Sequence, residues 1–168
     1  QSKPYANQKN LCSINLIPSN IYGEYDNFNL EKSHVIPALI RKFFFAKKNN
    51  ENSIEVWGDG TSKRDFIYCG DVADALIISA MYYSNPELPI NIATGKTTSI
   101  KEVVSTLKKI SKYKGKINFD TSKPMGAKER KFSIKNQKKY LIKFKPKYNI
   151  EKGFRNTYNW FEKNFNNK

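Results

Sequence analysis

The sequence contains a single histidine, and this residue is the first candidate for acid–base chemistry. His34 stands immediately before an apolar run that begins at Val35. An imidazole with an unperturbed pKa of about 6.5 can accept and release protons near neutral pH. A histidine at the start of a helix is also an ordinary surface residue. From its position alone, His34 is better interpreted as scaffold than as a proton carrier.

Tyr5 and Lys9 form a second pair that could do chemistry. Their spacing would place a phenol and an ammonium on adjacent turns of one helix, where the lysine charge lowers the phenol pKa. However, residues 11–18 are already predicted as the next strand, so the helix would have to end almost as soon as it began. We therefore interpret the pair as a chance match at the tail of a longer helix.

Two glycine motifs resemble phosphate-binding sequences, but each lacks a glycine that its motif requires. Gly95-Lys96-Thr97 imitates the end of a P-loop, but that motif needs a glycine at position 90, which is Ile90. Gly58-Asp-Gly60 resembles a dinucleotide fingerprint, but the third glycine is replaced by Lys63. The second motif is better interpreted as a tight turn.

The hydrophobic pattern predicts strands that alternate with helices, which is typical of an α/β fold. A hairpin is expected, because the Gly58–Gly60 turn separates two extended runs. Asp71 is expected to cap a helix, and Ser99 with Glu102 forms a capping box. The expected strands are 13–18, 54–57, 64–68, 90–93 and 117–120, and the expected helices are 35–45, 72–80, 99–110 and 150–161.

The length and composition describe a single globular domain that is unusually basic. The 168 residues include 30 basic and 15 acidic side chains, a net charge of +15 that comes entirely from residues 101–168. A lysine-rich surface of a compositionally biased genome and a surface for an anionic partner both remain open. Cys12 and Cys69 lack the spacing of metal or redox motifs, so no metal is expected and both are predicted to be buried free thiols. No export signal or membrane span is recognised, which favours a cytoplasmic protein and no membrane partner.

Several longer motifs occur in a characteristic order along the chain. They are Pro18-Ser-Asn20-Ile-Tyr-Gly23, Asp26-Asn-Phe28, Ser33-His-Val-Ile-Pro-Ala-Leu39, Val56-Trp-Gly-x-Gly-Thr61 with Arg64-x-Phe66, Asp71-Val, Asn91-Ile-x-Thr-Gly95 and Asp120-Thr-Ser-Lys-Pro124. Together they resemble the GDP-L-fucose synthase family of extended short-chain dehydrogenase/reductases, and the resemblance extends from about Leu11 to Phe161. The first and fourth motifs are shared with many nucleotide-sugar epimerases and dehydratases.

This resemblance implies the C-terminal part of such an enzyme: the end of a Rossmann-type parallel sheet with a small α/β substrate domain. Residues 1–168 are thus expected to be the substrate-binding portion, a fragment that is inactive alone. The N-terminal half would bind NADP and supply the catalytic tyrosine and lysine, and the complete enzyme is expected to be a homodimer. The implied reaction uses NADPH to epimerise a GDP-4-keto-6-deoxy sugar beside its ketone and then to reduce the ketone.

The same resemblance assigns roles residue by residue. His34 matches one partner of the acid–base pair, which reverses its interpretation as scaffold. Asn20 matches a substrate contact, and Val35, Leu39 and Trp57 match the wall that faces guanine, although all three also suit plain core packing. The other assigned positions are Pro18, Ser19 and Ile21 with Asn20 beneath the nicotinamide, Arg64 and Lys131 at the diphosphate, and Lys42 where the family has an arginine.

Three other interpretations stay open. The chain could derive from another NAD(P)-dependent nucleotide-sugar epimerase or dehydratase, because some motifs are shared. A basic nucleic-acid-binding module would explain the charge, although no recognised nucleic-acid-binding motif is present. A non-catalytic remnant would need another chain to complete its sheet.

Overall fold

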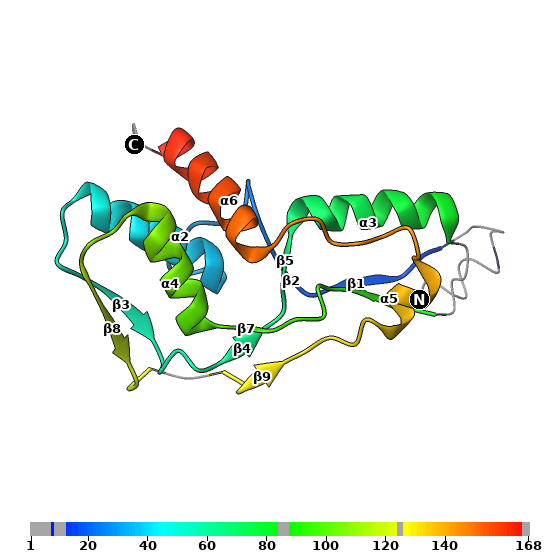
Figure 1. Cartoon of the computed structure of the whole chain (residues 1–168), viewed down its shortest axis with the longest axis horizontal. Helices are drawn as coiled ribbons and strands as arrows, with labels where there is room; N and C mark the ends of the chain where they lie inside the picture. Colours follow the sequence, from blue (N-terminus) through cyan, green and yellow to red (C-terminus); the bar gives the residue numbers. More distant parts are fainter. Residues whose placement is uncertain (1–7, 9–12, 84–87, 124–125, 166–168) are drawn as a thin grey trace.

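Short strands and longer helices alternate along the chain and form an elongated molecule with two lobes (Figure 1). The computed structural model describes residues 8, 13–83, 88–123 and 126–165. The predicted helix tail with Tyr5 and Lys9 lies outside the described residues, as does Cys12. The first lobe contains α2 (Val35–Lys48), α4 (Ile100–Ser111) and α6 (Ile150–Phe165), with strands β3 (Ser53–Trp57) and β8 (Lys116–Asp120).

The second lobe is built around a parallel strand pair that α3 covers (Figure 1). Strands β2 and β5 lie between the lobes, next to a three-stranded sheet in the order β7, β4, β9. The elements of the second lobe are β1 (Leu16–Pro18), β6 (Ile90–Ile92), α3 (Cys69–Tyr82) and α5 (Lys135–Tyr140). The central strands are β2 (Asn20–Tyr22), β5 (Phe66–Tyr68), β7 (Thr98–Ser99), β4 (Lys63–Arg64) and β9 (Glu129–Arg130). This architecture confirms the predicted α/β class.

Strand β5 joins the two hydrophobic cores, because successive side chains of a strand point to opposite faces. Phe66 and Tyr68 belong to the core of the first lobe, where they lie with the helices α2, α4 and α6. Ile67, between them, is fully buried in the core of the second lobe with Ile90 and Ile92. One short strand therefore fixes both lobes relative to the central region.

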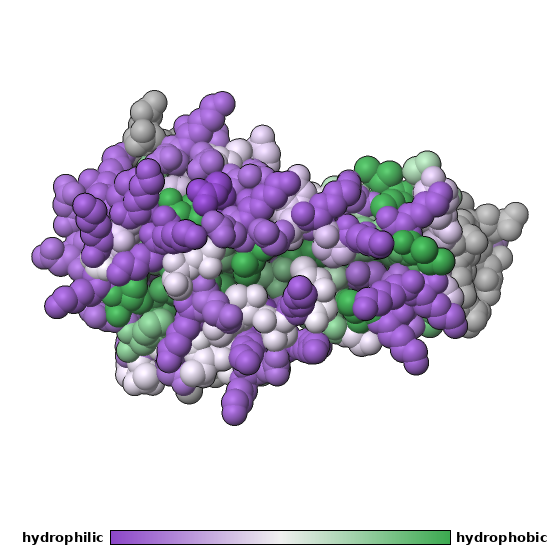
Figure 2. All heavy atoms as spheres, viewed as in Figure 1, coloured by the Kyte–Doolittle hydropathy of each residue, from purple (hydrophilic) through white to green (hydrophobic). Residues whose placement is uncertain are grey.

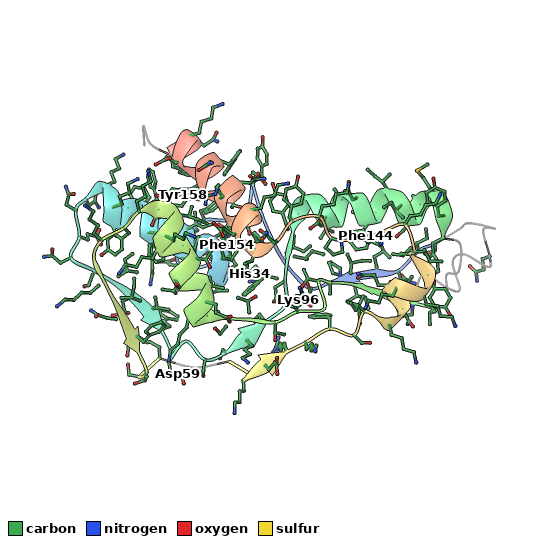
Figure 3. All side chains as sticks on the ribbon, in the orientation of Figure 1. His34, Asp59, Lys96, Phe144, Phe154 and Tyr158 are labelled. Atoms are coloured by element: carbon green, nitrogen blue, oxygen red, sulfur yellow. The ribbon has the colours of Figure 1, made fainter. Side chains whose placement is uncertain are left out.

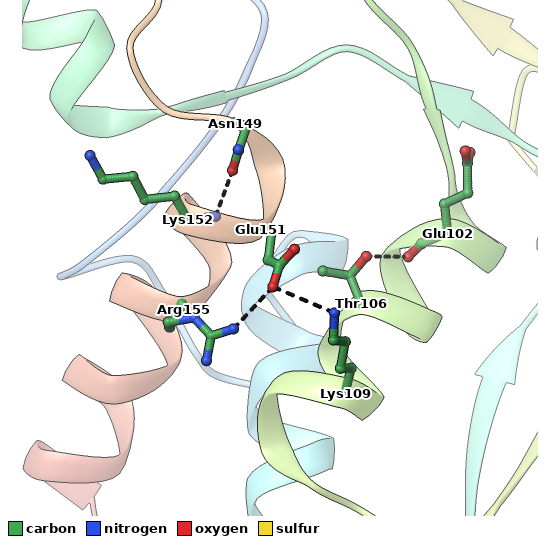
Figure 4. Close-up of polar contacts among 7 residues, drawn as sticks. All are labelled: Glu102, Thr106, Lys109, Asn149, Glu151, Lys152 and Arg155. Atoms are coloured by element: carbon green, nitrogen blue, oxygen red, sulfur yellow. Dashed lines mark hydrogen bonds and ion pairs between the residues drawn. The ribbon is translucent and has the colours of Figure 1, made fainter.

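Helices α4 and α6 pack beside each other and are joined by a polar bridge at the surface (Figure 4). Glu151 accepts a hydrogen bond from Arg155 at 3.0 Å, and its carboxylate lies 3.9 Å from the Lys109 ammonium. The predicted capping box is confirmed, since the Ser99 hydroxyl accepts from the Glu102 N–H and the Glu102 carboxylate accepts from the Ser99 N–H. These contacts define where α4 begins and how α6 lies against it.

The predicted hairpin between residues 54–57 and 64–68 is wrong. The turn itself is present, since Gly58 and Gly60 both have positive φ angles, near 79° and 75°. However, β3 pairs with β8 in parallel, while β4 pairs with β7 and β9, and β5 pairs with β2. The glycines therefore redirect the chain instead of folding it back. Local turn residues specify that the chain bends, whereas distant strands decide its hydrogen-bonding partner.

Asp71 is not the predicted N-cap. Helix α3 begins at Cys69, so Asp71 lies in its first turn and is fully buried. Its carboxylate accepts hydrogen bonds from the backbone N–H groups of Lys147 and Tyr148, at 2.8 and 3.2 Å. Asp71 thus holds the segment that leads to α6 against α3. Among the residues described, none of the helices has the length and apolar character needed to cross a membrane.

Candidate functional site

A cleft of about 700 Å³ lies between β2 and the start of α2 and contains most of the predicted site residues. Asn20, His34 and Arg64 line it, although they come from three separate parts of the fold. Ser19, Ile21 and Val35 complete the part of the lining that the sequence predicted. Pro18 does not line the cleft; it ends β1 in register with Ile92. The arrangement combines an imidazole, an amide and a guanidinium around one space.

His34 is the residue immediately before α2. Its side chain is exposed and does not cap the helix. Its backbone is extended (φ −72°, ψ 167°), and the side chain makes no capping hydrogen bond. Helix α2 can begin directly after it, because Pro37 occupies the first turn, where a missing N–H costs nothing. Figure 3 shows His34 near the middle of the long axis of the molecule. The imidazole is thus available to a ligand in the cleft.

Asn20 is held in place by hydrogen bonds to the chain between β4 and β5. Its side-chain amide donates to the Asp65 carbonyl at 2.7 Å, and its backbone N–H donates to the same oxygen at 3.2 Å. Ser19 separates β1 from β2 and donates its backbone N–H to Ile92 at 2.9 Å. The side-chain carbonyl of Asn20 is not used by these bonds, so it can accept a hydrogen bond from a ligand hydroxyl.

A smaller recess of about 270 Å³ adjoins the cleft through Val35, which lines both. Leu39 is buried in its wall, whereas Trp57 is 61% exposed at its edge. Lys42 also lines the recess and donates to the Glu55 carbonyl at 2.8 Å. An exposed indole beside aliphatic side chains is suited to stack against a flat aromatic ring.

Of the predicted diphosphate ligands, Arg64 lies in β4 and Lys131 directly follows the neighbouring strand β9, whose Arg130 is a cation that the sequence analysis missed. Strand β4 runs parallel to β9 with Arg64 opposite Arg130, and Lys131 follows directly. The Arg64 guanidinium donates to the carbonyls of Lys63 and Ala127, both at 2.7 Å. Burial and the nearby Arg130 lower the pKa of Arg64. Arg64 reaches the cleft, whereas Lys131 is exposed and does not line it.

Glu24 and Cys69, which the sequence analysis did not assign to the site, also line the cleft near Gly23. The Tyr68 hydroxyl donates to the two carboxylate oxygens of Glu24, at 2.6 and 2.7 Å, and the Cys69 thiol donates to Glu24 at 3.5 Å. Burial raises the pKa of Cys69, and the Glu24 carboxylate raises it further. Cys69 is a free thiol as predicted, although it is only partly buried. In the described residues no group of three or more His, Cys, Asp or Glu side chains could hold a metal ion.

We expect Cys69 to react slowly with iodoacetamide, because only the thiolate attacks and a raised pKa reduces its fraction at a given pH. In a Cys12→Ser background, the pH at which alkylation reaches half its maximal rate should lie above that of a free cysteine peptide. Glu24→Gln removes a negative charge beside the thiol, so this midpoint should move to lower pH. Glu31→Gln, at an exposed site outside the cleft, is the control and should leave it in place. A midpoint equal to that of the free peptide would contradict the observed environment.

Comparisons with known proteins agree with this geometry. The model of the NAD dependent epimerase/dehydratase family matches residues 1–93. A probable GDP-L-fucose synthase of Oryza sativa subsp. japonica is 38% identical over 95% of this chain. A GDP-L-fucose synthetase of Naegleria fowleri bound to NADP superposes with a TM-score of 0.88 at 30% identity over 98% of this chain. A GDP-6-OMe-4-keto-L-xylo-heptose reductase of C. jejuni gives a TM-score of 0.86 at 29% identity over 97% of it.

The chain spans about half the length of these relatives: 48% of the rice protein, 51% of the Naegleria chain and 57% of the C. jejuni chain. The relatives are enzymes that act on nucleotide sugars, according to their names. The resemblance identified from the sequence motifs is therefore confirmed by sequence and by structure.

Proposed function

Because this chain belongs to the NAD dependent epimerase/dehydratase family, we propose that it is the substrate-binding half of an NADP-dependent epimerase/reductase for a GDP-4-keto-6-deoxy sugar. The observation that carries the proposal is the shared lining of the cleft and the recess through Val35. A nucleotide sugar has a flat base, a diphosphate and a sugar in sequence. The recess offers an aromatic wall, and the cleft beside it offers the Arg64 guanidinium and polar groups.

In this proposal each side chain has one task. The guanine ring lies against Trp57, Val35 and Leu39, with Lys42 at the edge of the recess. Arg64 binds the diphosphate, and Lys131 approaches it from the end of β9. The sugar lies in the cleft, where the side-chain carbonyl of Asn20 accepts a hydrogen bond from a sugar hydroxyl. His34 removes a proton from a carbon beside the ketone, which is acidic because the enolate is stabilised by the ketone.

NADP fits this half of the site only in part. Bound NADPH would supply the hydride that reduces the ketone. Ser19, Asn20 and Ile21 line the cleft, and the exposed Ile21 side chain can offer apolar contact to a flat ring. The described residues contain no glycine-rich turn between a strand and a helix to hold the cofactor phosphates. We therefore expect the cofactor to need the N-terminal half of a complete enzyme, whose homodimeric state stays a prediction.

The surface of the second lobe supports a partner half. Four large apolar side chains of α3 are more than half exposed: Leu76, Ile77, Met81 and Tyr82. Figure 2 shows apolar residues gathered at this end of the molecule. In the described part of the chain β1 is paired only with β6, which leaves its other edge unpaired. Such a face favours association, and we propose that the cofactor-binding half covers it.

Base selectivity tests the proposal. The chain in a Trp160→Phe background should bind GDP more tightly than UDP, because guanine covers more of the Trp57 indole and the aliphatic wall than uracil does. Binding should quench the fluorescence of Trp57, and titration calorimetry should follow Trp57→Leu, in which the preference for GDP shrinks. Equal affinity for GDP and UDP would favour a different nucleotide. Binding of neither would overturn the proposal for this chain.

A further inference from the structure

Asp65 is a fully buried carboxylate that lies between the strands β4 and β5. A charged carboxylate loses its hydration when it is buried, so it must be compensated by hydrogen-bond donors or by a cation. Asp65 receives four donors from two different loops. Its Oδ1 atom accepts from the Thr94 N–H at 3.1 Å, the Thr94 hydroxyl at 2.7 Å and the Ser19 hydroxyl at 3.4 Å, and its Oδ2 atom accepts from the Gly95 N–H at 2.8 Å.

The main chain of Asp65 makes a separate connection. Its carbonyl oxygen accepts both the side-chain amide and the backbone N–H of Asn20, at 2.7 and 3.2 Å. The carboxylate thus binds the loop after β6 and, through Ser19, the link after β1, while the carbonyl binds Asn20 at the start of β2. These loops follow the carboxyl ends of two parallel strands, where ligands bind in open α/β sheets.

We propose that Asp65 is a positioning residue that sets the orientation of the Asn20 amide by fixing its own main chain to the Thr94–Gly95 turn. The turn is anchored independently of Asp65, because the Gln137 side chain accepts a hydrogen bond from the Ala93 N–H at 2.9 Å and donates one to the Ala93 carbonyl at 3.1 Å. Gly95 supplies the positive φ angle of 75° that the turn requires. The carboxylate transmits this constraint to the peptide that holds Asn20. The inference rests on the proposed function, since Asn20 serves the sugar of a GDP-sugar in that account.

Asp65→Asn keeps the shape of the side chain but replaces one oxygen by a donor. The amide oxygen can still accept from Thr94, so the new NH₂ group faces the Gly95 N–H, donor against donor. Thr94→Val removes one hydroxyl at nearly constant volume, and Thr94→Ser retains it. Asp74→Asn, a surface carboxylate of α3 that is paired with Lys147, is the control for the loss of one negative charge.

The test compares GDP-fucose with GDP by titration calorimetry on the full chain. Asp65→Asn should lower the affinity for GDP-fucose roughly 3- to 10-fold, the factor for one misplaced hydrogen bond. The affinity for GDP should stay within about twofold, because Arg64, although it directly precedes Asp65, is held by its own hydrogen bonds to the carbonyls of Lys63 and Ala127. Thr94→Val should show a smaller loss of the same kind, while Thr94→Ser and Asp74→Asn should match the wild type. Equal losses for GDP and GDP-fucose, or none for GDP-fucose, would overturn the proposal.

Hydrogen exchange separates this inference from the proposed function. In Asp65→Asn, the backbone N–H of Asn20 should exchange faster together with that of Gly95, although its acceptor atom is unchanged. If only Gly95 and Thr94 exchange faster, the coupling through Asp65 is refuted. If the wild type binds neither GDP nor GDP-fucose, the proposed function fails and the sugar role of Asp65 fails with it. Exchange at Asn20 still decides the structural coupling in that case. If Asp65→Asn does not fold, the Thr94 pair gives the same readout.

Discussion

Replacing His34 by glutamine should slow proton exchange at the carbons beside the substrate ketone by about 10²- to 10⁴-fold, the usual contribution of a general acid–base group. The enzyme for this measurement is a chimera of this chain with the complementary half of the Naegleria fowleri relative. Solvent deuterium incorporation into a GDP-4-keto-6-deoxy sugar reports the step. Glutamine resembles imidazole in size and polarity, but it cannot carry a proton at neutral pH.

This substitution is expected to change the chemistry without changing the stability of the fold. The His34 side chain makes no capping hydrogen bond to α2, so its loss should leave the thermal midpoint of unfolding unchanged. Hydride transfer to a substrate that is already epimerised should persist, because the ketone and cofactor are untouched. Lys32→Gln, an exposed change two residues away, is the matched control. Wild-type exchange rates in His34→Gln would return His34 to the scaffold.

Arg64→Ala should weaken GDP binding roughly 10- to 100-fold, since charge-assisted hydrogen bonds contribute about 1.5–3 kcal/mol each. Arg64→Lys should recover only part of the affinity, because a lysine lacks the planar fork of the guanidinium. Lys131→Ala should have a smaller effect, because Lys131 is exposed and lies outside the lining of the cleft. Titration calorimetry of GDP into the three variants measures these differences.

Guanosine distinguishes a lost diphosphate contact from a disturbed site. Arg64 also holds the carbonyls of Lys63 and Ala127, so removing it could loosen the segment before β9. A local diphosphate contact predicts that guanosine affinity stays unchanged in Arg64→Ala. Equal losses for guanosine and GDP would mean that the substitution distorts the recess. Unchanged GDP affinity would remove Arg64 from the proposed site.

Periodic features of the sequence predicted the elements well, because they depend on neighbouring residues. The capping box at Ser99 and the apolar face of α6 with Phe154, Tyr158 and Phe161 are confirmed. Pairing between strands was predicted less well. The Gly58–Gly60 turn implied a hairpin, but β3 pairs with β8, some sixty residues further along the chain. Such a contact is decided by the packing of the whole lobe and has no local signature.

In the candidate site, too, local motifs were predictable from the sequence and long-range contacts were not. The motifs predicted Asn20, His34, Val35 and Arg64 as residues of one site, and the structure brings these four residues to one cleft. The role of Asp65 could not be predicted from the sequence, because its hydrogen-bond donors Thr94 and Gly95 lie about thirty residues further along the chain. The order Arg64-Asp65-Phe66 from β4 into β5 is visible in the sequence, but only the fold shows that Asp65 is buried.

The position of GDP on this chain tests the central claim most directly. In a two-dimensional NMR titration of the ¹⁵N-labelled chain, we expect the largest shift changes at the backbone N–H groups around the recess and the cleft. Val35, Leu39, Trp57 and Arg64 should lead, and the exposed lysines of residues 138–145 should move little. Changes confined to those lysines would indicate nonspecific binding of an anion to a basic surface. That result, or no change at saturating GDP, would contradict the account.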